Sequence, residues 1–432
     1  MALGKLAVNE ANDGFTVDGQ PFFWLADTCW SAFTNIPEAD WEYYLTRRAE
    51  QGFNVLQINT LPQWDRCRPD LGIYPYASED GVVFDWTQPN PAYWERARAL
   101  CERAVAHGIR PALILMWCNY VPGTWGAALA ARTGATLMPR EEIPAHVQRV
   151  YEYLSEFDPV YVISGDTDFK TDEGVAYYED TYAAIHALAG DEPLYTMHIN
   201  RGNATIPESL VDALDFYMFQ SGHNHAEQFN AHKLPETLAA KYPKKPMINA
   251  EPCYEMMGAS RNVYWRFSAQ DVRAAAWTSI FSDAFAGVTY GAHGIWNWQT
   301  AVSTGSILGE GFDAPFRWYE ALQLPGAWDY GMIADLLDFL GTRRPQAAQD
   351  ELDDTRDEIR LARIDEGAGA PAYAAYMPRA TKLKIKGELA GATAVAIDLE
   401  EKRIAHLPVQ VGEGATVVAQ HPFTADVLVV VR

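Results

Sequence analysis

The sequence predicts an α/β fold in which a (β/α)8 TIM barrel is followed by a small C-terminal β-sandwich. Between residues 21 and 294, eight apolar runs of strand length alternate with helical stretches, a pattern typical of a parallel barrel. Almost every run ends in a polar or aromatic side chain, at the position that forms the mouth of such a barrel. After about residue 345 the chain changes to short alternating runs separated by Gly and Asp, with almost no helical period. We therefore assign residues 1–345 to the barrel, with an N-terminal β-hairpin, and residues 346–432 to the sandwich.

A doubly wound open sheet is the competing architecture for the first part of the chain. Such sheets usually carry a Gly-rich phosphate turn after the first strand. No turn of this kind follows the first predicted strand, and neither a Walker nor a GxGxxG pattern is present. The barrel is therefore the preferred prediction.

The barrel elements follow one another in a regular order. An Asp18-Gly19 turn precedes the first strand, and the first helix lies between Pro37 and Gly52, which suit a helix start and a helix end. The predicted strands are residues 21–26, 53–59, 110–117, 160–164, 194–200, 214–220, 246–250 and 287–294. The predicted helices are residues 37–50, 91–107, 143–157, 174–188, 226–242, 268–285 and 328–340. Residues 61–90 form a loop too long for a plain connection, so we expect it to shape a site.

The sandwich is predicted from alternating runs without helical period. Its expected strands are residues 359–364, 372–377, 382–386, 393–399 and 427–431.

Composition restricts the possible ligands. The formal charge of −23 and the lack of a Lys/Arg stripe exclude nucleic acid as an expected partner, because such a surface repels phosphate. Neutral or cationic ligands fit better. The 14 Trp and 22 Tyr residues suffice to fill a large interior and leave rings that pack on the face of a sugar.

Five cysteines without CxxC spacing predict reduced, partly buried thiols rather than disulfides or a zinc knuckle. We expect no cofactor and no metal ion. No run of about 18 apolar residues occurs and the first ten residues lack a signal-peptide core, so we expect no membrane partner and a cytoplasmic location, or an exported one if a leader precedes this sequence. The oligomeric state stays open.

Two carboxylates at the ends of predicted strands are the candidate catalytic residues. Glu251 follows the strand at 246–250 and is itself followed by proline, and Asp166 follows the strand at 160–164. Hydrolysis of a glycosidic bond uses such a pair, one carboxyl group to protonate the leaving oxygen and one to attack or to activate water. Asp168 competes with Asp166 for the acid role. A strand-end carboxylate can instead cap a helix or pair with an arginine.

Other polar and aromatic residues at strand ends are candidates for binding substrate, through hydrogen bonds to hydroxyl groups or stacking on the ring. For each histidine, a structural, hydrogen-bonded imidazole is an equal alternative. These candidates are Asp27, Asn59, Trp117, Asn119, His198, Asn200, His223, His293 and Trp296. Glu255 is interpreted either as a neighbour of the Glu251 site or as an acid at a helix start.

Two other function classes stay open. A metal-dependent barrel hydrolase would use the His223-Asn224-His225 pair, completed by His198, His293 or Asp27. The first strand lacks an HxH pattern and the histidines are scattered over several strand ends, which weakens this alternative. A non-catalytic glycan-binding protein built on a degenerate barrel is the third class.

Several segments resemble glycoside hydrolase family 140, the apiosidase-like group. The resemblance extends from about residue 14 to the end of the chain. Its segments are FFWLADTCW, RRAEQGFNVLQIN, VISGDTDF, INAEPCYE, VRAAAWTSIFSDAFAGVTYGAHGIWNW and ALQLPGAWDYGMIADLL.

The resemblance implies a catalytic (β/α)8 barrel with a small C-terminal β-sandwich, often described as collagen-binding-like. It also implies a retaining, exo-acting hydrolase that removes a terminal sugar, D-apiose of a pectic side chain in characterised members. The catalytic Asp of the family falls on Asp166 and its nucleophile on Glu251. Members that digest pectin are normally exported.

Overall fold

The computed structural model describes residues 3–259, 265–300, 314–365 and 370–432. One sheet of eight parallel strands forms the barrel, in the order β10-β9-β8-β5-β4-β13-β12-β11. A parallel bridge between His198 and Met218 joins the two ends of this order and closes the barrel. The strands are β4 (Trp24–Thr28), β5 (Val55–Asn59), β8 (Arg110–Trp117), β9 (Val160–Gly165), β10 (Tyr195–Thr196), β11 (Tyr217–Phe219), β12 (Met247–Asn249) and β13 (Gly287–Tyr290). The predicted barrel is confirmed, and the open sheet is not observed.

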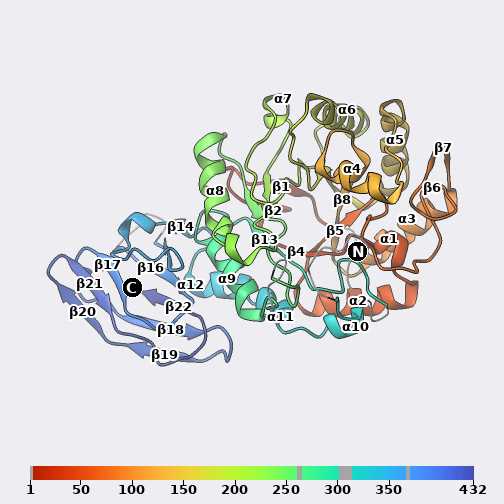
Figure 1. Cartoon of the computed structure of the whole chain (residues 1–432). Coiled ribbons are helices and arrows are strands. Elements are labelled where there is room, and N and C mark those ends of the chain that lie inside the picture. The colour runs from red at the N-terminus through yellow and green to blue at the C-terminus, as the bar shows by residue number, and fades with distance from the viewer. Residues whose placement is uncertain (1–2, 260–264, 301–313, 366–369) are drawn as a thin grey trace.

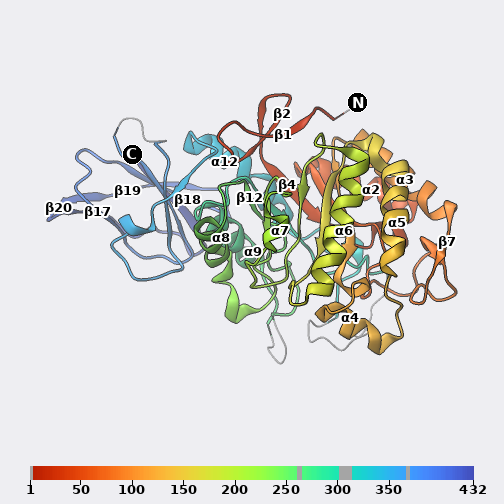
Figure 2. The same ribbon diagram turned by 90° about the horizontal axis from the view of Figure 1, so that it is seen from above.

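Helices surround the strands (Figures 1 and 2). They are α1 (Ala32–Asn35), α2 (Glu38–Glu50), α3 (Pro91–Ala106), α4 (Trp125–Ala130), α5 (Ile143–Leu154), α6 (Asp172–Ala189), α7 (Glu208–Val211), α8 (Asn230–Lys241), α9 (Ala269–Ile280), α10 (Trp318–Ala321), α11 (Gly326–Gly331) and α12 (Ile333–Leu340). Local sequence sets their ends. Ser268 and Asp271 form a capping box at the start of α9, and Gly52 adopts a φ of 83° just after α2, which is costly for other residues.

Several predicted elements differ in detail, and the helix predicted at 328–340 is two helices, α11 and α12. The predicted strand at 21–26 is two strands, β3 (Gln20–Phe22) and β4, and β3 forms a small antiparallel sheet with β1 (Leu6–Val8) and β2 (Phe15–Val17). The Asp18-Gly19 turn connects β2 and β3, and both residues have positive φ. The predicted loop at 61–90 contains a short antiparallel pair, β6 (Tyr76–Ala77) and β7 (Asp85–Pro89).

The C-terminal part consists of two facing antiparallel sheets. The larger has the order β14-β15-β16-β22-β18-β19 and the smaller the order β17-β21-β20. The strands are β14 (Gln346–Ala347), β15 (Arg360–Arg363), β16 (Tyr373–Met377), β17 (Leu383–Lys386), β18 (Ala394–Asp398), β19 (Ile404–Leu407), β20 (Val409–Gly412), β21 (Ala415–Val418) and β22 (Val427–Val431). The predicted sandwich-like region is confirmed.

The larger C-terminal sheet is buried on both faces. Along β22, Val427, Val429 and Val431 pack in the sandwich core, whereas Leu428 and Val430 belong to the barrel core. Alternate residues of a strand point to opposite faces of a sheet. The sheet therefore packs on the smaller sheet with one face and on the barrel with the other, and Figures 1 and 2 show it beside α8, α9 and α12.

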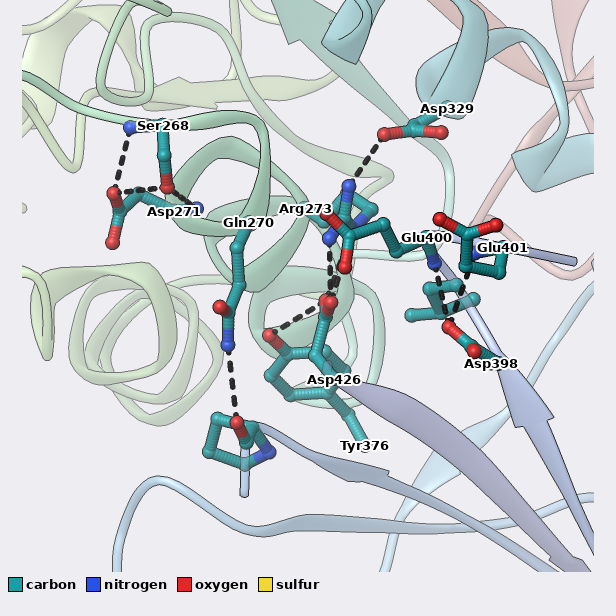
Figure 3. A network of polar contacts seen from close by, with 12 residues as sticks. Ser268, Gln270, Asp271, Arg273, Asp329, Tyr376, Asp398, Glu400, Glu401 and Asp426 are labelled. Atoms are coloured by element: carbon teal, nitrogen blue, oxygen red, sulfur yellow. Dashed lines mark hydrogen bonds and ion pairs between the residues drawn. The ribbon is translucent and has the colours of Figure 1, made fainter. Parts of the chain in front are cut away.

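A buried ion network joins the two parts (Figure 3). Arg273 of α9 lies between two carboxylates, 2.6 Å from Asp426, which precedes β22, and 2.6 Å from Asp329 of α11. The hydroxyl of Tyr376, in β16, donates to Asp426 at 3.2 Å. Asp426 is fully buried, so this network fixes α9 to the sandwich.

All five cysteines are free and buried. Within the described ranges, none of the helices combines the length and the apolar character that a membrane span needs.

Candidate active site

Glu251 lies just after β12, the seventh barrel strand, with only 7% of its surface exposed. Its Oε1 lies 2.9 Å from Nε2 of His223, in a hydrogen bond. Its Oε2 lies 3.1 Å from Nε2 of His198, without the alignment of a hydrogen bond. Burial alone would raise the pKa of Glu251, but the contacts with His198 and then His223 outweigh it and lower the pKa to about 2. Glu251 is therefore a carboxylate at any ordinary working pH.

Asp166 lies just after β9, the fourth barrel strand. Its φ of 51° is in the left-handed region, which Asp adopts more readily than most residues and which often marks functional sites. The indole Nε1 of Trp125 donates to the Asp166 carbonyl oxygen at 2.7 Å, and Nδ2 of Asn200 donates to Asp166 Oδ1 at 3.0 Å. These bonds fix both the backbone and the carboxyl group.

His198 connects the two carboxyl-bearing segments. The backbone N–H of Asp166 donates to Nδ1 of His198 at 3.1 Å, while Nε2 on the other side of the ring faces Glu251. Trp117 stacks on the imidazole, with ring centroids 5.7 Å apart at 27°. Gly165 allows this packing, because a Cβ there would lie 2.1 Å from Cε3 of Trp117. One buried ring thus links the ends of strands four and seven.

Sequence reasoning missed two aromatic residues at this site. The ring of Tyr254 lies 4.3 Å from that of His223, and its hydroxyl accepts a hydrogen bond from Trp30 Nε1 at 2.9 Å. Burial and the charge of Glu251 raise the pKa of Tyr254, so the phenol stays protonated. Both residues lie inside the quoted segments FFWLADTCW and INAEPCYE, but no spacing rule distinguishes them from core aromatics.

The structure connects five of the predicted residues to Glu251, either directly or through one another. They are Asp166, His198, Asn200, His223 and, through its stacking on His198, Trp117. The other predicted binding residues lie at neighbouring strand ends. Asn59 ends β5 and donates to Gln63, and Asn119 is buried in the 3₁₀ helix Cys118–Tyr120 after β8. His293 and Trp296 form a pair of their own after β13, where Trp296 Nε1 donates to His293 Nδ1 at 3.2 Å.

The prediction for Asp27 is wrong. Its side chain is fully buried, and its Oδ2 lies 2.6 Å from Nε of Arg48 and accepts a 2.6 Å hydrogen bond from the Tyr44 hydroxyl. Arg48 and Tyr44 belong to α2, so Asp27 points outward, between barrel and helix, and away from the mouth. It is an example of the arginine-paired strand-end carboxylate.

The residues of the metal alternative do not form one cluster. His198 and His223 both face Glu251, whereas His225 Nδ1 lies 3.2 Å from the carbonyl oxygen of Ala259. In the described part of the chain, no group of three or more His, Cys, Asp or Glu side chains is arranged to hold a metal ion. Asp168, the competing acid, forms an ion pair with Lys170 at 2.9 Å.

Comparison with known proteins identifies relatives of this chain. The model of the apiosidase-like catalytic domain matches residues 12–342, which include all the residues described above. No curated protein sequence matches the chain significantly.

Solved structures with the same fold include three glycoside hydrolases. One, described as a glycoside hydrolase, is 22% identical, covers 99% of this chain and 96% of its own, and has a TM-score of 0.77. A family 5 glycoside hydrolase from Bacteroides vulgatus is 22% identical over 99% of this chain and 93% of its own, with a TM-score of 0.78. A putative glycoside hydrolase from the same organism is 15% identical over 99% and 82%, with a TM-score of 0.69. The coverage of 99% means that these relatives share the C-terminal sheets as well as the barrel.

Proposed function

The chain belongs to the apiosidase-like family of glycoside hydrolases, so its substrate is a carbohydrate, and we propose that it is a retaining, exo-acting enzyme. It removes a terminal sugar, apiose or another pentose or deoxyhexose, from a plant or bacterial glycan. Glu251 is the nucleophile and Asp166 the general acid and base.

One observation carries this proposal. Glu251 is a buried carboxylate whose pKa is lowered to about 2 by two imidazoles, and one of these imidazoles also contacts the Asp166 segment. A nucleophile must be charged and desolvated before substrate binds. A carboxylate held in this state, and linked through His198 to the segment that carries a second carboxyl group, suits a two-step displacement at a sugar.

The two residues divide the reaction between them. In the first step, a carboxylate oxygen of Glu251 attacks the anomeric carbon, the glycosidic C–O bond breaks, and Asp166 gives its proton to the leaving oxygen. In the second step, Asp166 takes a proton from a water molecule as that water attacks the anomeric carbon, and Glu251 leaves as a carboxylate. The sugar keeps its anomeric configuration because it is inverted twice.

The test is a panel of nitrophenyl pentosides and hexosides, including an apioside, assayed with wild type and Asp166→Asn. We expect wild type to hydrolyse at least one substrate, and proton NMR to show a first product with the configuration of the substrate. Asp166→Asn should lower kcat/KM by about 100-fold or more on substrates with poor leaving groups, the usual contribution of a general acid, and much less on those with good ones.

Three outcomes would contradict the proposal. An inverted first product would exclude the retaining mechanism. Equal activity of Asp166→Asn and wild type on poor leaving groups would exclude Asp166 as the acid. Binding of sugars without any turnover by wild type would favour the glycan-binding alternative.

A further inference from the structure

The segment after β10, residues 198–200, contacts both proposed catalytic carboxyl groups. His198 lies 3.1 Å from Oε2 of Glu251, and Asn200 donates to Oδ1 of Asp166 at 3.0 Å. Residues two apart in an extended segment point to the same side. One short segment just after the fifth strand therefore reaches the ends of the fourth and the seventh.

The hydrogen bond from the Asp166 amide fixes the tautomer of His198. The amide N–H points at Nδ1, so this nitrogen must present its lone pair, and a proton there would face the amide proton. The geometry therefore places the ring proton on Nε2, the nitrogen that faces Glu251.

The segment itself is rigidly held. The backbone N–H of His198 donates to the Ser164 carbonyl oxygen at 3.2 Å, and that of Asn200 donates to the Thr167 carbonyl oxygen at 2.8 Å. The imidazole is 1% exposed, stacked on Trp117 and met edge-on by Trp30 at 5.6 Å. The backbone of the segment and the imidazole are therefore held by contacts within the protein.

We propose that His198 and Asn200 are positioning residues that align the two carboxyl groups with each other. His198 ties Oε2 of Glu251 to the backbone of Asp166, and Asn200 orients the Asp166 carboxyl group. This inference rests on the proposed function of Glu251 and Asp166, and it assigns to both residues a role in alignment in place of the expected direct contact with sugar.

Replacements of His198 separate its two contacts. Gln places an amide nitrogen near the position of Nε2, which keeps an N–H group facing Glu251, whereas Asn replaces only the acceptor at Nδ1. Phe fills the space and removes both. We expect His198→Phe to lower kcat by about 100-fold with little change in KM, the cost of a misplaced reacting group. His198→Gln should recover more of this loss than His198→Asn.

Asn200→Ala should show a different signature. Because Asn200 acts on the acid, its loss should lower kcat/KM by about tenfold on poor leaving groups, a part of what general acid catalysis contributes, and leave kcat/KM on good ones unchanged. The His198 variants should lower kcat on both kinds of substrate. A variant that is only destabilised would not discriminate between leaving groups. His225→Gln, which changes a histidine bound to a backbone carbonyl, is the matched control and should keep wild-type kcat.

The measurements are kcat, KM and thermal unfolding of each variant on a substrate that wild type hydrolyses. Equal kcat for the Gln, Asn and Phe variants would overturn this inference and leave the proposed function standing. A loss of kcat/KM in Asn200→Ala that is the same for all leaving groups would do the same. If His198→Phe does not fold, the comparison of Gln with Asn still decides. Wild type inactive on the whole panel would overturn the proposed function, and this inference with it.

Discussion

Glu251 and Glu255 lie four residues apart at the end of the seventh strand, and their environments favour opposite charge states. Both are buried, with 7% and 2% of their surface exposed. Glu251 faces two imidazoles, and its pKa is lowered to about 2. Glu255 accepts hydrogen bonds at Oε2 from the Tyr290 hydroxyl at 2.6 Å and the Gly326 amide at 2.9 Å. Burial outweighs these neutral donors and raises its pKa to about 7.

The difference shows that burial does not decide the charge of a carboxyl group, because the donors around it do. Imidazoles at the mouth keep Glu251 ionised for chemistry. A phenol and a backbone amide leave the pKa of Glu255 raised to about 7. The hydrogen bonds from these two groups connect Glu255 to β13 and to the start of α11. The same segment thus supplies one acid with a lowered pKa and one with a raised pKa.

The largest expected effect is a difference in kcat between variants of the two acids. Glu251→Gln removes the nucleophile and should lower kcat by at least about 10⁴-fold, as the loss of a catalytic group does elsewhere. Glu255→Gln, the matched control, keeps size and hydrogen-bonding capacity and should keep kcat within about threefold, because Glu255 touches neither carboxyl group of the site. Steady-state kinetics on one substrate checks both, and a similar loss in both variants would contradict the division of roles.

Asp426 is a third buried carboxylate, and its partner Arg273 is a permanent cation. Asp426→Ala leaves Arg273 buried with half of its partners and should lower the free energy of unfolding by about 3–5 kcal/mol. The control is Asp338→Ala, which breaks an exposed pair with Arg343 and should cost less than about 1 kcal/mol. Chemical denaturation measures both values, and equal costs would show that the network does not brace the barrel.

The pH dependence of stability should differ in sign between the two acids. The pKa of folded Glu255 is above its usual value of 4.5, so the folded state binds the proton more tightly and loses stability as pH rises from about 4.5 to about 7. This rise in the pKa corresponds to a loss of about 3 kcal/mol of folding stability over that pH range. Glu251, with a lowered pKa, instead loses its contribution as pH falls from about 4.5 to about 2.

Unfolding curves of wild type and Glu255→Gln between pH 5 and pH 8 test this sign. The stability of wild type relative to the variant should decrease as pH rises. A difference that stays constant over this range would show that Glu255 is already ionised at pH 5.

The smallest expected effect concerns the two imidazoles of the mouth. If His198 and His223 contact the Glu251 carboxylate and do not bind a catalytic metal ion, a chelator such as EDTA should leave kcat unchanged. The control is Glu251→Gln assayed in the same buffer, which should stay inactive with or without chelator. A loss of activity in chelator that added divalent metal restores would favour the metal-dependent alternative.

Sequence alone was sufficient for the barrel and for the positions of Asp166 and Glu251 at the ends of two of its strands. Strand length, apolar character and a polar residue at each end identified the strands that carry Asp166 and Glu251, because a barrel collects such ends at one mouth. The same rule was wrong for Asp27, since a strand end does not reveal to which side the side chain points. Only the structure shows Arg48 of α2 meeting it from outside.

The remaining features depend on long-range packing. Tyr254 and Trp30 belong to different strand ends 224 residues apart, and no local pattern predicts their hydrogen bond. The role of His198 depends on a backbone amide, which every residue but proline carries and which no sequence signal marks. In the sandwich, the run of valines in β22 indicates a strand, but its burial on both faces follows from the barrel beside it.

The position of β22 has a consequence for folding. This strand pairs with β16 on one side and β18 on the other, so it occupies the middle of the larger C-terminal sheet although it follows both in the sequence. Until residues 427–431 have paired, β16 and β18 have no common neighbour. Leu428 and Val430 also pack in the barrel core, so assembly of this sheet and completion of the barrel flank are one event.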